Sequence, residues 1–195
     1  MALKRWLLLA AVALPPLVLS AIGLSHPKLL TVESAGWWTT MHVILVPLFP
    51  LLAVAIWILL RADRSALGWG GRVAALAYVA FYGALDAISG IAAGTVVLDT
   101  GSTDDTGSLF AIGHRLGVIG GYAFLVALIL VLGSAWRAGS RGVPFYVAAV
   151  VLLVSGYLFL SSHIYWPKGG LTMIGFAIGF FLIEFTRKRA TPPAA

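Results

Sequence analysis

Four histidines are the side chains in this sequence with the clearest capacity for chemistry: His26, His42, His114 and His163. Neutral imidazole is a good ligand for zinc, copper, iron and haem iron. The chain contains no cysteine, which excludes disulfides, thiolate metal sites and CxxC redox motifs. No pair of histidines has the HExxH or i, i+4 spacing of a local metal motif. A shared site therefore depends on a fold that brings distant histidines together.

The composition indicates what kind of fold this is. Of the 195 residues, 61% are hydrophobic and only 10% are charged, whereas a soluble domain has about 25% charged residues. The net charge of +6 comes from short basic clusters between apolar runs, which is typical of membrane topology and not of nucleic-acid binding. Phosphate-binding loops and catalytic-triad motifs are also missing from the sequence. We therefore expect a lipid bilayer, and no nucleic acid, as the chain's main partner.

Long apolar runs predict the elements that span this bilayer. About 20 apolar residues are needed to cross about 30 Å of hydrocarbon as a helix, and continuous runs favour helices over a barrel. Six runs qualify, at residues 6–24, 37–60, 73–98, 109–136, 143–166 and 170–186. We expect one all-α domain over residues 1–195, a compact bundle of six transmembrane helices. The number falls to five if the first run, which follows Lys4 and Arg5, is a cleaved signal peptide.

Basic residues predict the orientation of the bundle, because lysine and arginine concentrate on the cytoplasmic side. One side holds ten of the 13: Lys4, Arg5, Arg61, Arg64, Arg72, Arg137, Arg141, Arg187, Lys188 and Arg189. The opposite side holds Lys28 and Lys168, together with four of the seven acidic residues: Glu33, Asp99, Asp104 and Asp105. This predicts a multi-pass protein of a bacterial-type plasma membrane with both termini in the cytoplasm.

This orientation places all four histidines in the outer half. His42, His114 and His163 lie near the outer ends of the second, fourth and fifth runs, and a rise of about 1.5 Å per residue puts them within one turn of the same depth. His26 follows the first run on the same side. Ionisable residues at membrane depth usually face the bundle interior or a polar cavity. We therefore predict an outward-facing site formed by His42, His114 and His163.

Several occupants of this site remain open. Two facing histidines could hold haem b, with Arg115, Lys28 or Lys168 meeting its propionates. Three histidines with an open fourth position could instead bind zinc or copper. In the simplest alternative, each histidine is an interfacial side chain with a hydrogen-bonded ring. The leading hypothesis is a membrane redox or metal-handling protein, with its enzyme status open.

Asp86 also needs an explanation, because it lies near the middle of the third run. A carboxylate at the bilayer centre costs about 2.5–3.5 kcal/mol on insertion scales, which favours protonation or a partner. Arg115 is the natural partner by charge, although it lies about 10 Å nearer the outer surface at 1.5 Å per residue. Asp86 is either a structural clamp between helices or part of a proton or ion relay. The second interpretation makes the protein a small proton-coupled transporter.

Glycines at four-residue spacing predict close helix packing. They occur in the third, fourth and sixth runs, as Gly90 and Gly94, then Gly113, Gly117 and Gly121, then Gly175 and Gly179. These faces could pack within one chain, in a homodimer, or against a partner membrane subunit. The last arrangement fits a third hypothesis, a non-catalytic subunit or assembly factor.

Overall fold

The computed structural model describes residues 2–187, and these residues form a helical bundle without a strand. Its elements are α1 (Ala2–Gly23), α2 (Ala35–Leu48), α3 (Pro50–Leu59), α4 (Ala66–Leu85), the π-helix η1 (Asp86–Ala92), α5 (Ala93–Thr100), the 3-10 turn η2 (Asp104–Thr106), α6 (Gly107–Arg137), α7 (Val143–Phe159) and α8 (Lys168–Thr186). The predicted all-α class is confirmed.

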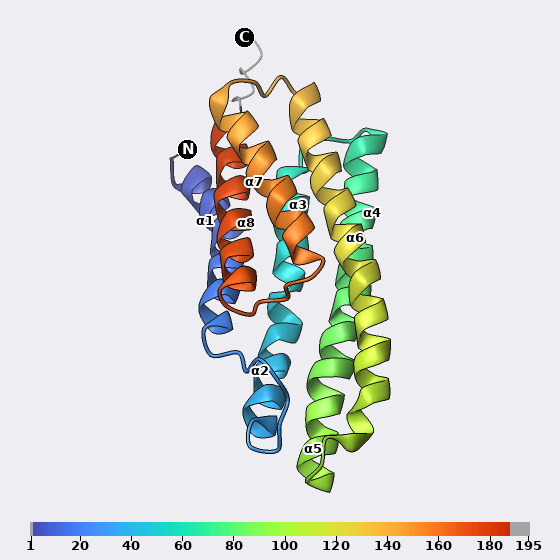
Figure 1. Cartoon of the computed structure of the whole chain (residues 1–195). Coiled ribbons are helices and arrows are strands. Elements are labelled where there is room, and N and C mark those ends of the chain that lie inside the picture. Colours follow the sequence, from blue (N-terminus) through green and yellow to red (C-terminus); the bar gives the residue numbers. More distant parts are fainter. Residues whose placement is uncertain (1, 188–195) are drawn as a thin grey trace, which may run out of the picture.

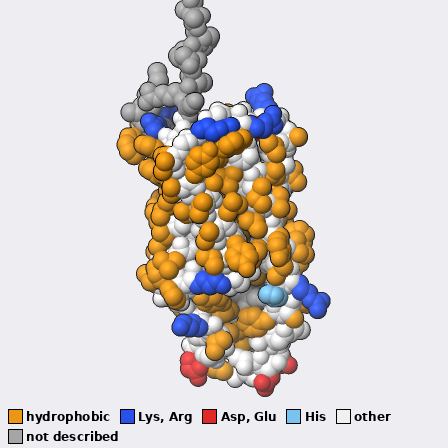
Figure 2. All heavy atoms as spheres, turned by 45° about the horizontal axis from the view of Figure 1, so that its top comes forward, with side chains coloured by type: hydrophobic (Ala, Val, Ile, Leu, Met, Phe, Trp, Pro, Cys, Tyr) orange, Lys and Arg blue, Asp and Glu red, His pale blue; other side chains and the backbone are white. Residues whose placement is uncertain are grey.

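Within residues 2–187, five helical stretches are long and apolar enough to cross a membrane. They are Leu3–Gly23, Ala35–Leu59, Ala66–Thr100, Asp104–Arg137 and Lys168–Thr186. Large apolar side chains also cover the outside of the bundle, as Figure 2 shows over its middle part. The chain is therefore a membrane protein whose surface is suited to lipid.

The fifth run departs from its predicted bounds of 143–166, since α7 is helical only to Phe159. Past this point His163 adopts a positive φ of 35°, and Pro167 has no amide hydrogen and disfavours the helical conformation of Trp166 before it. His163 therefore belongs to a loop, residues 160–167, and not to a helix. A loop can turn this side chain inward, which a straight helix would not do at the same position.

Two other runs are interrupted within the membrane. The second divides at Phe49 into α2 and α3, where Pro47 and Pro50 remove backbone donors, as their positions predict. Tyr78 donates a hydrogen bond of 3.3 Å to the carbonyl of Phe49 at this break. The third run contains η1, whose wider turn begins at Asp86. The sequence analysis did not anticipate this π-helix, a feature often found at functional sites.

The helices are arranged as two packed pairs with the other helices against them (Figure 1). Helix α4 lies along α6, α1 lies along α8, and α7 packs on α8. Helices α2 and α5 and the first turns of α6 extend beyond the other helices at one end of the bundle. The core between these layers is rich in fully buried aromatic side chains, among them Tyr78, Phe124, Phe176 and Phe180.

The glycines serve contacts within one chain. A methyl group at Gly113 or Gly117 would lie 2.0–2.1 Å from side chains of Ser89 or Leu85, on the third run. Similar groups at Gly175 and Gly179 would meet α7 and not the third or fourth run. The third and fourth runs therefore pack tightly on each other as predicted, while the sixth packs on the fifth.

Charge separates along the bundle. Figure 2 shows a row of lysine and arginine side chains at one end, a few more in the opposite half, and the acidic side chains at that opposite end. This distribution agrees with the predicted orientation, although Lys188 and Arg189 of the basic set lie outside the described residues. The basic end holds an ion pair between the buried Glu184 and the exposed Arg61, which donates to both carboxylate oxygens at 2.6 and 2.7 Å. Glu184 also lies 3.4 Å from Arg187, so it ties α8 to the end of α3.

We predict that Glu184→Gln destabilises the protein, because Glu184 is only 5% exposed and would lose two charge-assisted hydrogen bonds. The expected loss is about 1–3 kcal/mol, measured as a lower thermal unfolding temperature in detergent. Asp99→Asn, which removes the same charge from an exposed position, should leave the unfolding temperature unchanged. Equal effects of the two variants would contradict a structural role for this pair.

Candidate metal centre

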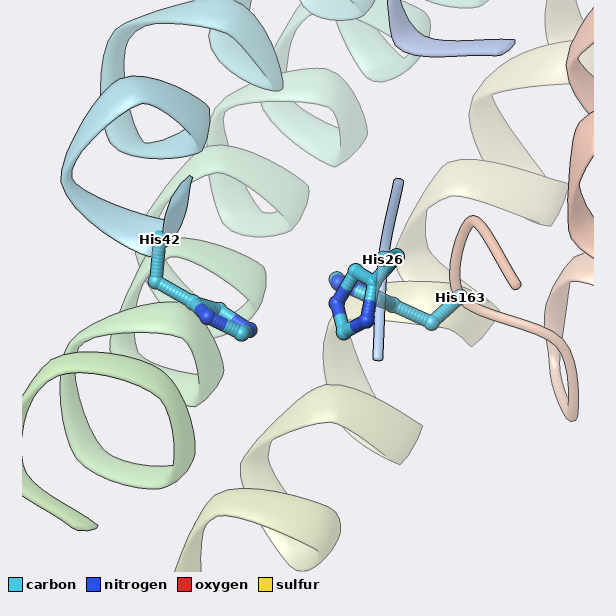
Figure 3. Close-up of side chains that lie close together, drawn as sticks. All are labelled: His26, His42 and His163. Carbon is cyan, nitrogen blue, oxygen red and sulfur yellow. The ribbon is translucent and has the colours of Figure 1, made fainter. Parts of the chain in front are cut away.

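Three histidines from three separate segments meet at one point (Figure 3). His26 lies in the loop after α1, His42 lies on α2, and His163 lies in the loop between α7 and α8. One ring nitrogen from each histidine lies within 4.8 Å of the other two. The centre of the His26 ring is 5.2 Å from that of His42 and 5.3 Å from that of His163. We call these three residues the histidine cluster.

Hydrogen bonds fix the direction of two of these rings. His42 Nδ1 lies 2.7 Å from the carbonyl oxygen of Trp38, and His26 Nδ1 lies 2.7 Å from that of Pro27. A carbonyl only accepts, so each Nδ1 carries the hydrogen and donates it. Each Nε2 is then left with a free lone pair. This is the arrangement that orients most metal-ligating histidines in proteins.

The third ring is held by a tyrosine. His163 Nδ1 lies 2.9 Å from the hydroxyl oxygen of Tyr82, and its Nε2 is buried without a hydrogen-bond partner. The positive φ of His163 places this ring in a sparsely populated backbone conformation, and such strain tends to occur at functional sites. The His163 imidazole is therefore held in the interior by a backbone conformation, a positive φ, that is unfavourable for a residue other than glycine.

The cluster is shielded from water. His26 is 7% exposed and His42 is 3% exposed. Burial, together with the neighbouring His42, lowers the pKa of His26 to about 4 despite the hydrogen bond to Pro27, so its ring is neutral at physiological pH. His26 Nε2, like that of His163, has no hydrogen-bond partner. A buried polar atom without a partner costs about 1–3 kcal/mol, and a bound cation would remove that cost from both nitrogens.

Aromatic side chains form the walls of the cluster and hold its loops. Tyr165 and Trp38 pack edge-on against His26, with ring centres 4.3 and 5.2 Å away. Trp37 donates a hydrogen bond of 2.9 Å to the carbonyl of Ser25, beside His26. Trp166 donates one of 2.8 Å to Ser20 near the end of α1. These bonds explain how two loops present histidines with defined positions.

A cavity of about 370 Å³ lies beside the cluster. His42 and His163 line it, and so does the exposed side chain of His114 on α6. Since an exposed residue and two cluster residues line the same cavity, it connects the surface of the bundle with the histidine cluster.

The structure brings together some of the predicted site residues. His42 and His163 meet, but His114 is exposed on α6 and lies outside the group of three. His26 is the third member of the cluster, although the sequence analysis had placed it in the outer loop and not in the site. Arg115 is exposed on α6, beside His114. The sequence signal for His26 was its position on the same side of the membrane as the other histidines.

Asp86 lies in the interior, at the start of η1. Its exposure is 0%, and neither carboxylate oxygen has a hydrogen-bond partner. The hydroxyl of Ser89, one turn further, donates instead to the carbonyl of Leu109 at 3.3 Å. Among residues 2–187, the basic side chain within 4 Å of Asp86 is His163, whose Nε2 is 3.7 Å from Oδ1. Arg115, the partner expected by charge, does not fill this role.

The histidine cluster is close to the dimensions of a metal site. Three nitrogens that lie within 4.8 Å of one another are at most about 2.8 Å from a common centre, compared with about 2.0–2.1 Å for a zinc–imidazole bond. An ion would therefore draw each ring inward by less than about 1 Å.

Comparisons with known proteins found no match: no protein-family model, curated protein or solved structure matches this chain. The geometry of the cluster is therefore the basis for a proposed function.

The position of His42 depends on the absence of a side chain at Gly90. A methyl group there would lie 2.2 Å from two atoms of the His42 ring. We predict that Gly90→Ala destabilises the protein by about 1–3 kcal/mol, the usual cost of overpacking. Thermal unfolding in detergent measures this loss. Gly83→Ala is the matched control, since a methyl group at Gly83, on α4, meets nothing within 4 Å.

A double mutant tests whether the contact with His42 is the cause. Gly90→Ala combined with His42→Ala should be more stable than the sum of the two single effects predicts, because the clashing ring is gone. Additive effects would show that Gly90 acts through some other neighbour.

Proposed function

We propose that this protein binds a transition-metal ion at His26, His42 and His163 and acts in metal handling or redox chemistry at the membrane. The observation that carries this proposal is the convergence of three imidazoles from three chain segments, two of them buried and that of His163 11% exposed, with one nitrogen of each within 4.8 Å of the others. Hydrogen bonds hold the Nδ1 atoms of these rings. In His26 and His42, where Nδ1 donates to a carbonyl, Nε2 is the atom with a lone pair available to an ion. His163 offers its Nε2 in the tautomer whose Nδ1 donates to the Tyr82 hydroxyl.

The packing of the rings favours an ion over haem b. An axial pair of histidines holds haem only when the space between them is open for the flat macrocycle. Here the His26 ring stands edge-on to both His42 and His163, at interplanar angles of 86°. Arg115, Lys28 and Lys168, the side chains expected to meet haem propionates, are all exposed. Three imidazoles around one point instead match a three-histidine metal site.

The charge distribution supports an outward-facing site. The cluster lies towards the end of the bundle that carries the exposed acids Glu33, Asp99, Asp104 and Asp105. An acidic surface attracts cations and raises their local concentration. With both termini in the cytoplasm of a bacterial-type cell, the ion would reach the cluster from outside, along the cavity lined by His114.

Metal analysis of purified protein tests the proposal. We expect about one zinc, copper, iron or nickel ion per chain in protein that was stripped with a chelator, reloaded and desalted. His42→Ala and His163→Ala should each lower the metal affinity by at least about 10-fold, because one of three ligands is lost. His114→Ala is the matched control, since this histidine is exposed and lies outside the cluster. It should keep wild-type affinity.

Two results would contradict the proposal. One is a wild-type protein that takes up none of these metals under conditions in which it stays folded. The other is an absorption spectrum of stoichiometric haem in the purified protein, lost in His42→Ala and His163→Ala, which would make haem b the occupant.

A further inference from the structure

The carboxylate of Asp86 lies next to His163 of the histidine cluster, and within residues 2–187 it accepts no hydrogen bond. It is fully buried, and both of its oxygens are without hydrogen bonds. His163 Nε2, which is also without a partner, lies 3.7 Å from Asp86 Oδ1. Two buried polar atoms therefore face each other and leave each other unsatisfied. A positive centre between them would satisfy both.

The distance between these atoms fits two ligands of one ion better than a hydrogen bond. A nitrogen–oxygen hydrogen bond is about 2.7–3.2 Å long, and the observed separation of 3.7 Å exceeds this range. Two donor atoms at about 2.0–2.1 Å from a tetrahedral ion lie about 3.3 Å apart. The pair is thus within about 0.4 Å of the spacing that coordination requires.

One residue, Trp38, contacts both His42 and the π-helix of Asp86, the first through its backbone and the second through its side chain. The carbonyl of Trp38 accepts the Nδ1 hydrogen bond of His42 at 2.7 Å. Its indole nitrogen donates to the carbonyl of Ser89, within η1, at 3.1 Å. The π-helix that begins at Asp86 is therefore fastened to the turn of α2 that orients His42. This connection gives the interruption of the third run a role in placing the carboxylate.

We propose that Asp86 is the fourth ligand of the site, so that three imidazoles and one carboxylate bind a divalent transition-metal cation of the zinc class. This inference rests on the proposed function of the histidine cluster. The carboxylate supplies what the three neutral imidazoles lack, a negative charge, and it lowers the net charge of the occupied site from +2 to +1. Burying a charge in an apolar interior is costly, so this reduction favours a divalent ion.

The same donor set selects against monovalent copper. Copper(I) prefers soft sulfur ligands, whereas carboxylate is a hard ligand. The chain has no cysteine, and the donors around the cluster are nitrogen and oxygen atoms. A copper(I) ion would need only the imidazoles and would gain little from Asp86. Removal of this carboxylate should therefore change zinc binding and copper(I) binding to different extents.

The test compares Asp86→Asn with wild type, using Zn²⁺, Co²⁺ and copper(I) as probes of the purified full-length protein. Asp86→Asn keeps the size of the side chain and removes its charge. We expect Zn²⁺ affinity to fall about 100-fold, the upper end of the loss found for altered metal sites, while copper(I) affinity changes less than about 3-fold. Co²⁺ bound to wild type should give the intense visible absorption of a four-coordinate tetrahedral site, and this absorption should change in Asp86→Asn. Asp99→Asn, at an exposed acidic position, is the matched control and should behave as wild type.

Thermal stability separates a ligand from a structural clamp. A clamp would lose stability in the metal-free Asp86→Asn protein. A ligand would not, because Asp86 makes no hydrogen bond within residues 2–187 that Asp86→Asn could break. If Asp86 is a ligand, zinc should raise the unfolding temperature of Asp86→Asn less than that of wild type, because weaker binding stabilises the folded state less.

Each outcome has a distinct meaning. Unchanged zinc affinity and an unchanged Co²⁺ spectrum in Asp86→Asn, with affinity lost in His42→Ala, would overturn the role of Asp86 and leave the proposed function intact. A wild-type protein that binds none of the probes would overturn both. If Asp86→Asn does not fold, Asp86→Glu keeps the charge and moves the carboxylate by one methylene. It should then bind zinc with an altered Co²⁺ spectrum, and a wild-type spectrum would overturn the inference.

Discussion

The central constraint on this structure is the burial of polar atoms in three neighbouring side chains, His26, His163 and Asp86, that do not satisfy one another. In a chain whose helices are surrounded by lipid, a buried polar atom without a protein partner cannot form a hydrogen bond to water instead. Most polar side chains of this protein are paired, as in the contact of Arg61 with Glu184. His26, His163 and Asp86 are not, and their unpaired atoms lie close together. The proposed cation would give these atoms a shared partner.

Three irregular features of the chain lie at the histidine cluster and Asp86. Gly90 leaves room for the His42 ring, and η1 begins at Asp86. The early end of α7 turns His163 inward through a positive φ. Each feature weakens regular helix packing, through a missing side chain, a wider turn or a strained residue. All three features lie at the residues of the proposed metal site, which would explain why the chain tolerates them.

The sequence predicts the parts of this structure that follow from regular helices. Long apolar runs locate the membrane helices, and helix depth brings His42 and His163 to one level. The same reasoning selects His114, because depth along a helix does not define which face a side chain occupies. It misses His26, since a loop can fold back over the bundle in ways that a straight helix cannot. It also misses η1 and the pairing of Glu184 with Arg61, which joins segments far apart in the chain.

X-ray absorption at the zinc edge of the zinc-loaded protein is the most direct test of the metal centre. The proposed site predicts four nitrogen or oxygen ligands at about 2.0–2.1 Å, with the outer-shell scattering of imidazole rings from three histidines. This pattern should be retained in His114→Ala and should lose imidazole scattering in His42→Ala. An oxygen-only coordination shell without imidazole scattering would show that the ion binds elsewhere and would contradict the account.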